Sequence, residues 1–280
     1  MNYEHGRLLW IRRVLKHLWF QILFRTGATA WARWRLSGEN GTIVLTLHRV
    51  LDDHGARLTN SPGGMIVRQQ TFQRALDYLS KTIEVIPLQE GASFKPGLHL
   101  ALTFDDGWID NFESAVPELL QRAIPSCIFL CSDMVGKVHP FWPERANAIW
   151  KSAISDRSSL NQLRLLLRRF GHPSNIKSQE AFLEMLKGLD SPDRAAALHA
   201  LADHFSTDES GIDSTMCWEH VRELHRKGVT FGSHTANHEI LPGLSQKTRE
   251  RELSDSKLEI YAQLGKPVRF FFLSEWKLGC

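Results

Sequence analysis

The chain has 280 residues, of which 42% are hydrophobic and 23% charged, so it can bury a sizeable core without disulfides or structural metals. Its net charge is only +3, and no basic run is interleaved with aromatic residues, which argues against a nucleic-acid partner. The four cysteines form no CxxC pair and leave the redox compartment undecided.

The chain begins with an apolar stretch that basic residues interrupt, 7-RLLWIRRVLKHLWFQILFR-25. No uninterrupted run approaches the ~18 apolar residues of a membrane-spanning helix, and no signal peptide with a clean apolar centre and cleavage site is recognisable. Such a helix either makes a peripheral contact with a membrane or packs on its own domain, and a poor signal anchor is a third alternative. We interpret residues 1–38 as an N-terminal amphipathic helical segment. Localisation stays open between the bacterial cell envelope and the cytoplasm.

From residue 42 to residue 132 the sequence alternates between strand-like and helix-like segments. The predicted elements are, in chain order, strand 42–50, helix 71–82, strand 83–88, strand 98–104, helix 110–123 and strand 126–132. The strand 98–104 contains no Asp, Glu, Lys or Arg, so we expect it to be buried on both faces. Pro117 either interrupts its helix or marks a second start. This alternation favours a parallel sheet or barrel.

Residues 144–212 break the alternation, because they are rich in Leu, Ala and charged residues and contain no strand candidate. We interpret them as a helical insertion. The alternation then resumes with helix 216–228 closed by Gly228, strand 229–233, a helix from a Ser245 cap to Leu264 ended by Gly265, and strand 267–272.

Two acids follow the buried strand directly, in 102-LTFDDGW-108. The carboxyl ends of parallel strands carry the active sites of β/α architectures. Neighbouring residues of an extended chain point to opposite sides, so one of Asp105 and Asp106 can bind a cation while the other acts as a base. Gly107 permits a tight turn and the close approach of a ligand. The alternative is an ordinary Asp-Gly turn.

Two histidines follow another predicted strand, in 234-HTANH-238. Imidazoles four residues apart can reach one metal if the chain coils between them. One Asp with His234 and His238 would give zinc three protein ligands and an open position, which is the arrangement of catalytic sites. His48, at the end of the first strand, either lines the same pocket or is a hydrogen-bonded scaffold residue.

Aromatic residues accompany these strand ends. Trp108 either stacks on a sugar ring as a substrate-binding residue or belongs to the core. Phe141 and Trp142 are predicted to end another strand, and we assign Trp142 to the core.

The motifs together resemble the polysaccharide deacetylases with a NodB-type domain, also called carbohydrate esterase family 4. The first family motif, TFDDG, is present as residues 103–107, and the second, H-[ST]-x-x-H, as residues 234–238 with Thr235 in its second place. The segment 44-VLTLHRV-50 is similar to the first strand of the branch that acts on bacterial exopolysaccharides, with Leu47 replacing the usual Tyr. The resemblance covers roughly residues 42–272.

The resemblance implies a distorted (β/α)7-type barrel in residues 39–280. It also implies that Asp106, His234 and His238 hold zinc or a similar divalent cation, with Asp105 as general base. Thr235 would not bind the cation itself but would orient one of the metal-binding side chains. The implied reaction is removal of N-acetyl groups, with O-acetyl groups as a close variant. The implied partner is a polysaccharide of the N-acetylhexosamine type.

The chain departs from the family pattern after Phe272. There the family continues with a third motif and later with a histidine that acts as general acid, whereas this sequence reads 273-LSEWKLGC-280. We therefore expect the closing strands of the barrel to be missing. The alternative function is that of a truncated, inactive paralogue that at most binds metal or glycan. An amidohydrolase-type barrel is disfavoured, because its HxH pair is absent from the first strand.

Overall fold

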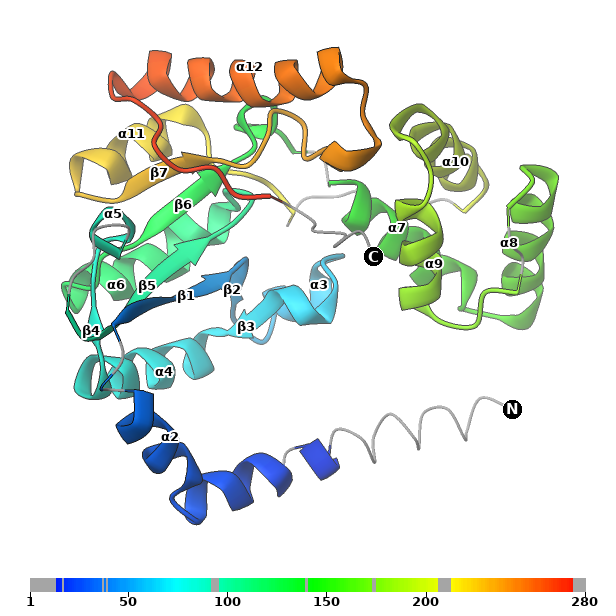
Figure 1. The fold of residues 1–280 in the computed structure, drawn as a ribbon. Coiled ribbons are helices and arrows are strands. Elements are labelled where there is room, and N and C mark those ends of the chain that lie inside the picture. The colour runs from blue at the N-terminus through cyan, green and yellow to red at the C-terminus, as the bar shows by residue number, and fades with distance from the viewer. Residues whose placement is uncertain are drawn as a thin grey trace.

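The computed structural model describes residues 14–16, 18–36, 38, 40–91, 96–138, 141–172, 175–205 and 213–273. Its centre is a five-stranded parallel sheet of order β1-β5-β6-β7, in which β4 also pairs with β5. These strands are β1 (Gly41–Leu47), β4 (Glu84–Val85), β5 (Leu98–Phe104), β6 (Cys127–Leu130) and β7 (Thr230–Ser233). Helices surround the sheet (Figure 1). The predicted α/β class with a parallel sheet is confirmed.

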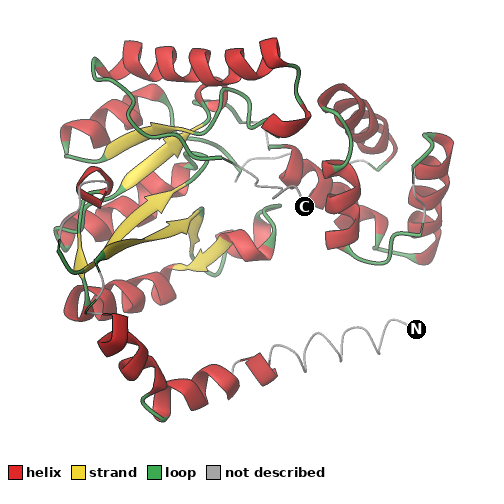
Figure 2. Cartoon of the chain, in the orientation of Figure 1, coloured by secondary structure: helices red, strands yellow, loops and turns green. Residues whose placement is uncertain are grey.

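Strand β5 organises the sheet. It pairs with β1 along its whole length, with β4 near its start and with β6 at its end, and all its residues after Leu98 are buried. Its apolar side chains, such as Leu102 and Phe104, belong to the main core with Phe72 and Leu76 of α4 (Gln69–Thr82). Because the strands are parallel, their carboxyl ends meet at one edge, and the strand arrows in Figure 2 point toward the side that carries α7 and α9.

The first predicted strand divides in two. Strand β1 ends at Leu47, and β2 (Arg49–Leu51) pairs instead with β3 (Ile66–Arg68) in a separate parallel sheet. The break places His48 between the two sheets. Short helices α3 (Gly55–Leu58) and α5 (Leu88–Gly91) lie in the following connections.

Pro117 lies at the start of a second helical piece, which was one of the two alternatives predicted for it. A π-helical turn, Asn111–Ala115, leads into α6 (Val116–Gln121). Proline has no backbone N–H, so the regular α-helical ladder is interrupted here and the chain forms a wider turn before it.

The helix ends near the C-terminus lie where the caps predicted them. Helix α11 (Trp218–Arg226) is followed by Gly228 at φ +94°. Helix α12 (Gln246–Leu264) begins after Ser245, whose hydroxyl accepts a hydrogen bond from the N–H of Thr248, and ends at Gly265 with φ +66°.

The predicted strand 267–272 is wrong in extent. Only Phe271 forms a bridge, to Ser233 of β7, with backbone hydrogen bonds from Ser233 N–H to Phe270 and from Phe272 N–H to Ser233. No described residues pair with the outer edge of this segment. This segment lines a cavity of about 880 Å³ together with Ser233, Leu241 and Leu253, and none of the predicted site residues is among the residues that line it.

Four successive helices fill the region between β6 and α11 in the described residues: α7 (Trp142–Ala153), α8 (Arg157–Arg169), α9 (Gln179–Lys187) and α10 (Ser191–His204). They enclose a second apolar core that includes Ile149, Leu163, Phe182 and Leu201. Phe141 and Trp142 do not end a strand, which corrects that prediction: Trp142 begins α7, and Pro143 occupies its first turn, where a missing N–H costs nothing.

Helical residues 18–25 and α2 (Ala28–Leu36) precede the sheet. Residues 1–13 and 17 lie outside the described part, so the predicted segment 7–25 is seen only in part. Among the helices that are described, none has the length and apolarity needed to cross a membrane.

Candidate metal centre

Three predicted ligands converge at the carboxyl edge of the sheet. Asp106 follows β5, His234 follows β7 and His238 lies four residues further on. Oδ1 of Asp106 is 3.4 Å from Nε2 of His234 and 3.4 Å from Nε2 of His238. One ligand atom from each residue lies within 4.8 Å of the other two, which suits a shared cation.

The hydrogen bonds around these side chains leave the metal-binding atoms available. Oδ2 of Asp106 accepts a hydrogen bond from Nε1 of Trp108 at 2.9 Å, whereas the buried Oδ1 has no hydrogen-bond partner. Nδ1 of His234 lies 3.0 Å from the carbonyl oxygen of Phe272. A proton on that nitrogen leaves the lone pair of Nε2 directed at Asp106, which is the tautomer that metal-bound histidines adopt.

The charges also fit a cation. Burial lowers the pKa of His238 to about 4 and also lowers the pKa of His234, so both imidazoles are neutral near pH 7. Burial opposes the ionisation of Asp106, but His238, His234, His48 and Trp108 together bring its pKa below the ordinary value. A carboxylate with two neutral imidazoles is a zinc-type donor set.

Backbone strain concentrates at the same place. Asp106, Thr235 and His238 have φ values of +73°, +70° and +60°, and among the described non-glycine residues only Ala123 shares this region. Each such residue costs on the order of 1 kcal/mol or more, and such strain clusters at functional sites. Gly107 also has φ +73°, and a Cβ there would lie 2.7 Å from Cδ2 of Leu130.

Neighbouring residues hold the strained histidine loop. Oγ1 of Thr235 accepts a hydrogen bond from the N–H of His238 at 2.9 Å. Glu252 of α12 accepts hydrogen bonds from the N–H groups of Ala236 and Asn237 at 3.0 and 2.8 Å. These contacts fix the loop without occupying the metal-binding atoms.

The helices between β6 and α11 also contact this loop. Glu239, directly after His238, forms a 2.7 Å ion pair with the buried Arg194 of α10 and accepts a 2.5 Å hydrogen bond from Ser191. The ring of Phe141 lies 5.1 Å from that of His238. The loop that carries His238 is therefore supported from both sides.

Trp108 does not lie where a sugar could stack on it. Its side chain is 0% exposed, packs edge-on against Phe141 at 5.0 Å and donates its indole N–H to Asp106. Of the two alternatives for Trp108, the core position holds, and the substrate-binding assignment is corrected. The indole instead orients the carboxylate.

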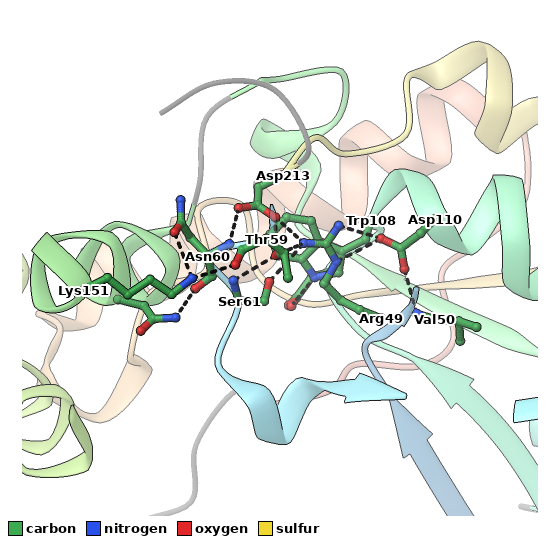
Figure 3. A network of polar contacts seen from close by, with 11 residues as sticks. Arg49, Val50, Thr59, Asn60, Ser61, Trp108, Asp110, Lys151 and Asp213 are labelled. Atoms are coloured by element: carbon green, nitrogen blue, oxygen red, sulfur yellow. Dashed lines mark hydrogen bonds and ion pairs between the residues drawn. The ribbon is translucent and has the colours of Figure 1, made fainter. Parts of the chain in front are cut away.

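Arg49 is a supporting residue that the sequence reasoning missed. Its guanidinium lies 4.2 Å from the centre of the Trp108 ring and forms ion pairs with Asp110 and Asp213 (Figure 3). Thr59 and Ser61 accept further hydrogen bonds from it. Arg49 directly follows His48 in the sequence. Its acidic partners Asp110 and Asp213 are 61 and 164 residues away, so no local sequence pattern indicates the network.

Asp105 and His48 lie beside the three ligands. Asp105 is buried, its Oδ1 has no hydrogen-bond partner, and burial together with the charge of Asp106 raises its pKa to about 8. Nε2 of His48 is 3.8 Å from Oδ2 of Asp105, and the His48 side chain is 34% exposed. The structure thus brings both predicted residues to the centre, with His48 on its more open side.

Glu144 of α7 is a second buried acid near the centre. Its side chain is 0% exposed, and burial, with the charges of Asp106 and Asp213, raises its pKa to about 8 against the opposing effect of Ser61. Unfolding exposes Glu144 to water, where it loses its proton near pH 4.5. This group therefore makes the folded state less stable as the pH rises from about 4.5 to about 8, by at most about 1.4 kcal/mol per pH unit.

We expect a Glu144→Gln variant to lose less stability than the parent between pH 5 and pH 8, because glutamine has no proton to release. The measurement is the free energy of urea unfolding of the metal-free proteins at both pH values. The exposed Glu180→Gln substitution in α9 serves as the control. An equal loss in the parent and in Glu144→Gln would show that Glu144 is not held protonated.

Comparisons with known proteins agree with the motifs. Residues 175–274, which contain the candidate ligands His234 and His238, match the family model "Polysaccharide deacetylase", and this confirms the resemblance. No curated protein matches the sequence. Solved structures similar to the chain include a polysaccharide deacetylase from Bacillus cereus (TM-score 0.48, 16% identity, 83% of this chain and 50% of that one). They also include IcaB from Ammonifex degensii (TM-score 0.48, 18% identity, 84% of this chain and 74% of that one). The chain thus spans about half the length of the Bacillus cereus protein.

Proposed function

We propose that this chain, which has a segment of the polysaccharide deacetylase family, is a metal-dependent hydrolase that removes acetyl groups from a polysaccharide. The observation that carries the proposal is that Asp106, His234 and His238 each bring one ligand atom to the same place, with Oδ1 of Asp106 buried and without a hydrogen-bond partner and with the buried Asp105 directly beside them. Zinc is the cation that we propose for this donor set.

When bound, the cation would supply a Lewis acid that polarises the acetamide carbonyl and lowers the pKa of water. The residues of the chain carry the proton transfers. Asp105 would take the proton of the attacking water, because its carboxyl group is buried directly beside Asp106 and its Oδ1 has no hydrogen-bond partner. Trp108 and Thr235 keep Asp106 and His238 in position.

His48 is the group that we propose as proton donor to the leaving amine. It lies 3.8 Å from Asp105 and is the more exposed of the two, so it can reach the leaving group on the substrate side. A proton taken by Asp105 and one given by His48 complete the hydrolysis to acetate and a free amine.

The substrate that we propose is a polymer of N-acetylhexosamine, with an O-acetylated polymer as the variant to be tested beside it. A peripheral membrane contact through residues 7–25 would bring the enzyme to a membrane-associated polymer. The site of action that we propose is the bacterial cell envelope or the cytoplasm beside it.

The proposed function is tested by removing and restoring the metal. Chelator-treated protein should release no acetate from N-acetylglucosamine oligomers, and one equivalent of zinc should restore release together with free amines. An O-acetylated xylan in a parallel assay separates the two kinds of acetyl group. Full activity after complete metal removal would contradict the proposal, and stoichiometric zinc binding without activity on either polymer would favour the inactive paralogue.

A further inference from the structure

The helical residues before the sheet expose large apolar side chains. Leu18, Trp19, Phe20, Phe24, Trp31 and Trp34 are between 50% and 69% exposed. The tryptophans elsewhere in the described residues are buried or half-buried. Exposed tryptophan is therefore confined to this one segment of the described chain, and scattered surface exposure does not account for it.

The charge of the same segment is one-sided. Residues 5–38 contain seven of the 34 Lys and Arg residues and none of the 31 Asp and Glu residues, so the remainder of the chain carries a net charge of −4. Lys16 and Arg25 flank the apolar residues 18–24. A positive segment with interfacial aromatic residues is complementary to a negatively charged bilayer surface.

Two helical pieces carry the exposed apolar side chains. Gly27, with φ +76°, separates residues 18–25 from α2. Trp31 and Trp34 are three residues apart in α2 and so share a face of that helix. Figure 1 shows both pieces extending away from the sheet beyond α4.

A second copy of the chain fits this segment less well. Self-association through residues 14–36 would bring two positive segments together with no acidic residue in either to pair with the charges. Anionic lipid headgroups neutralise the same charges, and tryptophan prefers the interfacial depth that such a helix reaches.

We propose that residues 14–36 dock this protein on the surface of a membrane that contains anionic lipids. The apolar side chains of residues 18–24 and of Trp31 and Trp34 enter the interface, and the basic side chains remain at the headgroups. This inference refines the membrane contact of the proposed function to residues 14–36 and to anionic lipids. Its failure would leave the proposed hydrolase activity untouched, because none of the catalytic or metal-binding residues belongs to this segment.

The test is co-sedimentation of the full chain with vesicles. One set contains phosphatidylglycerol and phosphatidylethanolamine, and the other contains phosphatidylcholine alone. We expect at least tenfold stronger partitioning to the anionic set, weakened by added salt. A Trp31→Ser/Trp34→Ser variant should lose at least tenfold in partitioning.

A matched pair of exposed apolar residues gives the control. Leu258 and Tyr261 of α12 are 63% and 50% exposed at the same spacing of three, so Leu258→Ser/Tyr261→Ser should partition like the parent. Equal binding of the tryptophan variant and the parent would overturn the proposal. Absence of vesicle binding by the parent would also overturn it. A third contradicting result would be a parent dimer that the tryptophan substitutions dissociate and the control substitutions do not, because the segment would then bind a second copy of the chain. The circular dichroism spectrum and the melting temperature of each variant show that the fold persists.

Discussion

An Asp105→Asn variant should retain its metal and lose about 10²–10⁴-fold in kcat. Asparagine has nearly the same shape as aspartate, but it cannot accept the proton of the attacking water. Because Asp105 is not one of the three converging ligands, the substitution leaves Asp106, His234 and His238 in place. In the metal-free protein burial raises the pKa of Asp105 to about 8, so a neutral amide at this position should leave the stability of the metal-free fold close to that of the parent.

The measurement pairs acetate release with zinc content for Asp105→Asn and for Asp133→Asn. Asp133 is exposed at the end of the neighbouring strand β6 and serves as the matched control. If the Asp105→Asn variant keeps one bound zinc and the kcat of the parent, Asp105 is not the general base. Loss of zinc in that variant would instead make Asp105 a ligand.

A His238→Asn variant should bind zinc more than about 100-fold more weakly than the parent. Loss of a supporting contact behind a ligand typically costs 10–100-fold in affinity, and loss of the ligand itself should cost more. Asparagine is chosen because His238 has φ +60°, a conformation that asparagine tolerates better than alanine. The variant therefore separates the loss of the imidazole from distortion of the loop.

The affinity is measured by competition with a chromophoric chelator, together with the melting temperature of the metal-free protein. His199→Ala, at an exposed histidine of α10, should bind zinc like the parent. Stoichiometric zinc at parental affinity in His238→Asn would show that His238 is not a ligand.

Local signals predicted the framework well, because their causes are local. Ser245 and Gly265 bound α12 through a cap and a left-handed residue, and both can be read from neighbouring side chains. The run 98–104 contains no Asp, Glu, Lys or Arg, and this local feature was enough to predict a buried strand. The aspartates and histidines at two strand ends then predicted that they would meet, since parallel strands end at one edge.

Long-range contacts and competing local signals explain the rest. The burial of Trp108 depends on Arg49 and Phe141, which lie far from it in the sequence and which no spacing relates to it. The strand expected at Phe141 and Trp142 is a helix start, and Pro143 with Glu144 in the first turn was an available signal for it. The segment 267–272 has strand-like residues but only one described neighbour, β7, to pair with.

The left-handed conformations of Asp106, Thr235 and His238 set stability against function. Glycine at Thr235 would relieve backbone strain there, but it would remove the hydroxyl that accepts the N–H of His238. Selection for thermal stability alone would favour such relaxed loops, whereas selection for a metal-dependent activity would oppose them. Thermostable descendants obtained by directed evolution without an activity screen would therefore accumulate changes at these loops before changes in the core around β5.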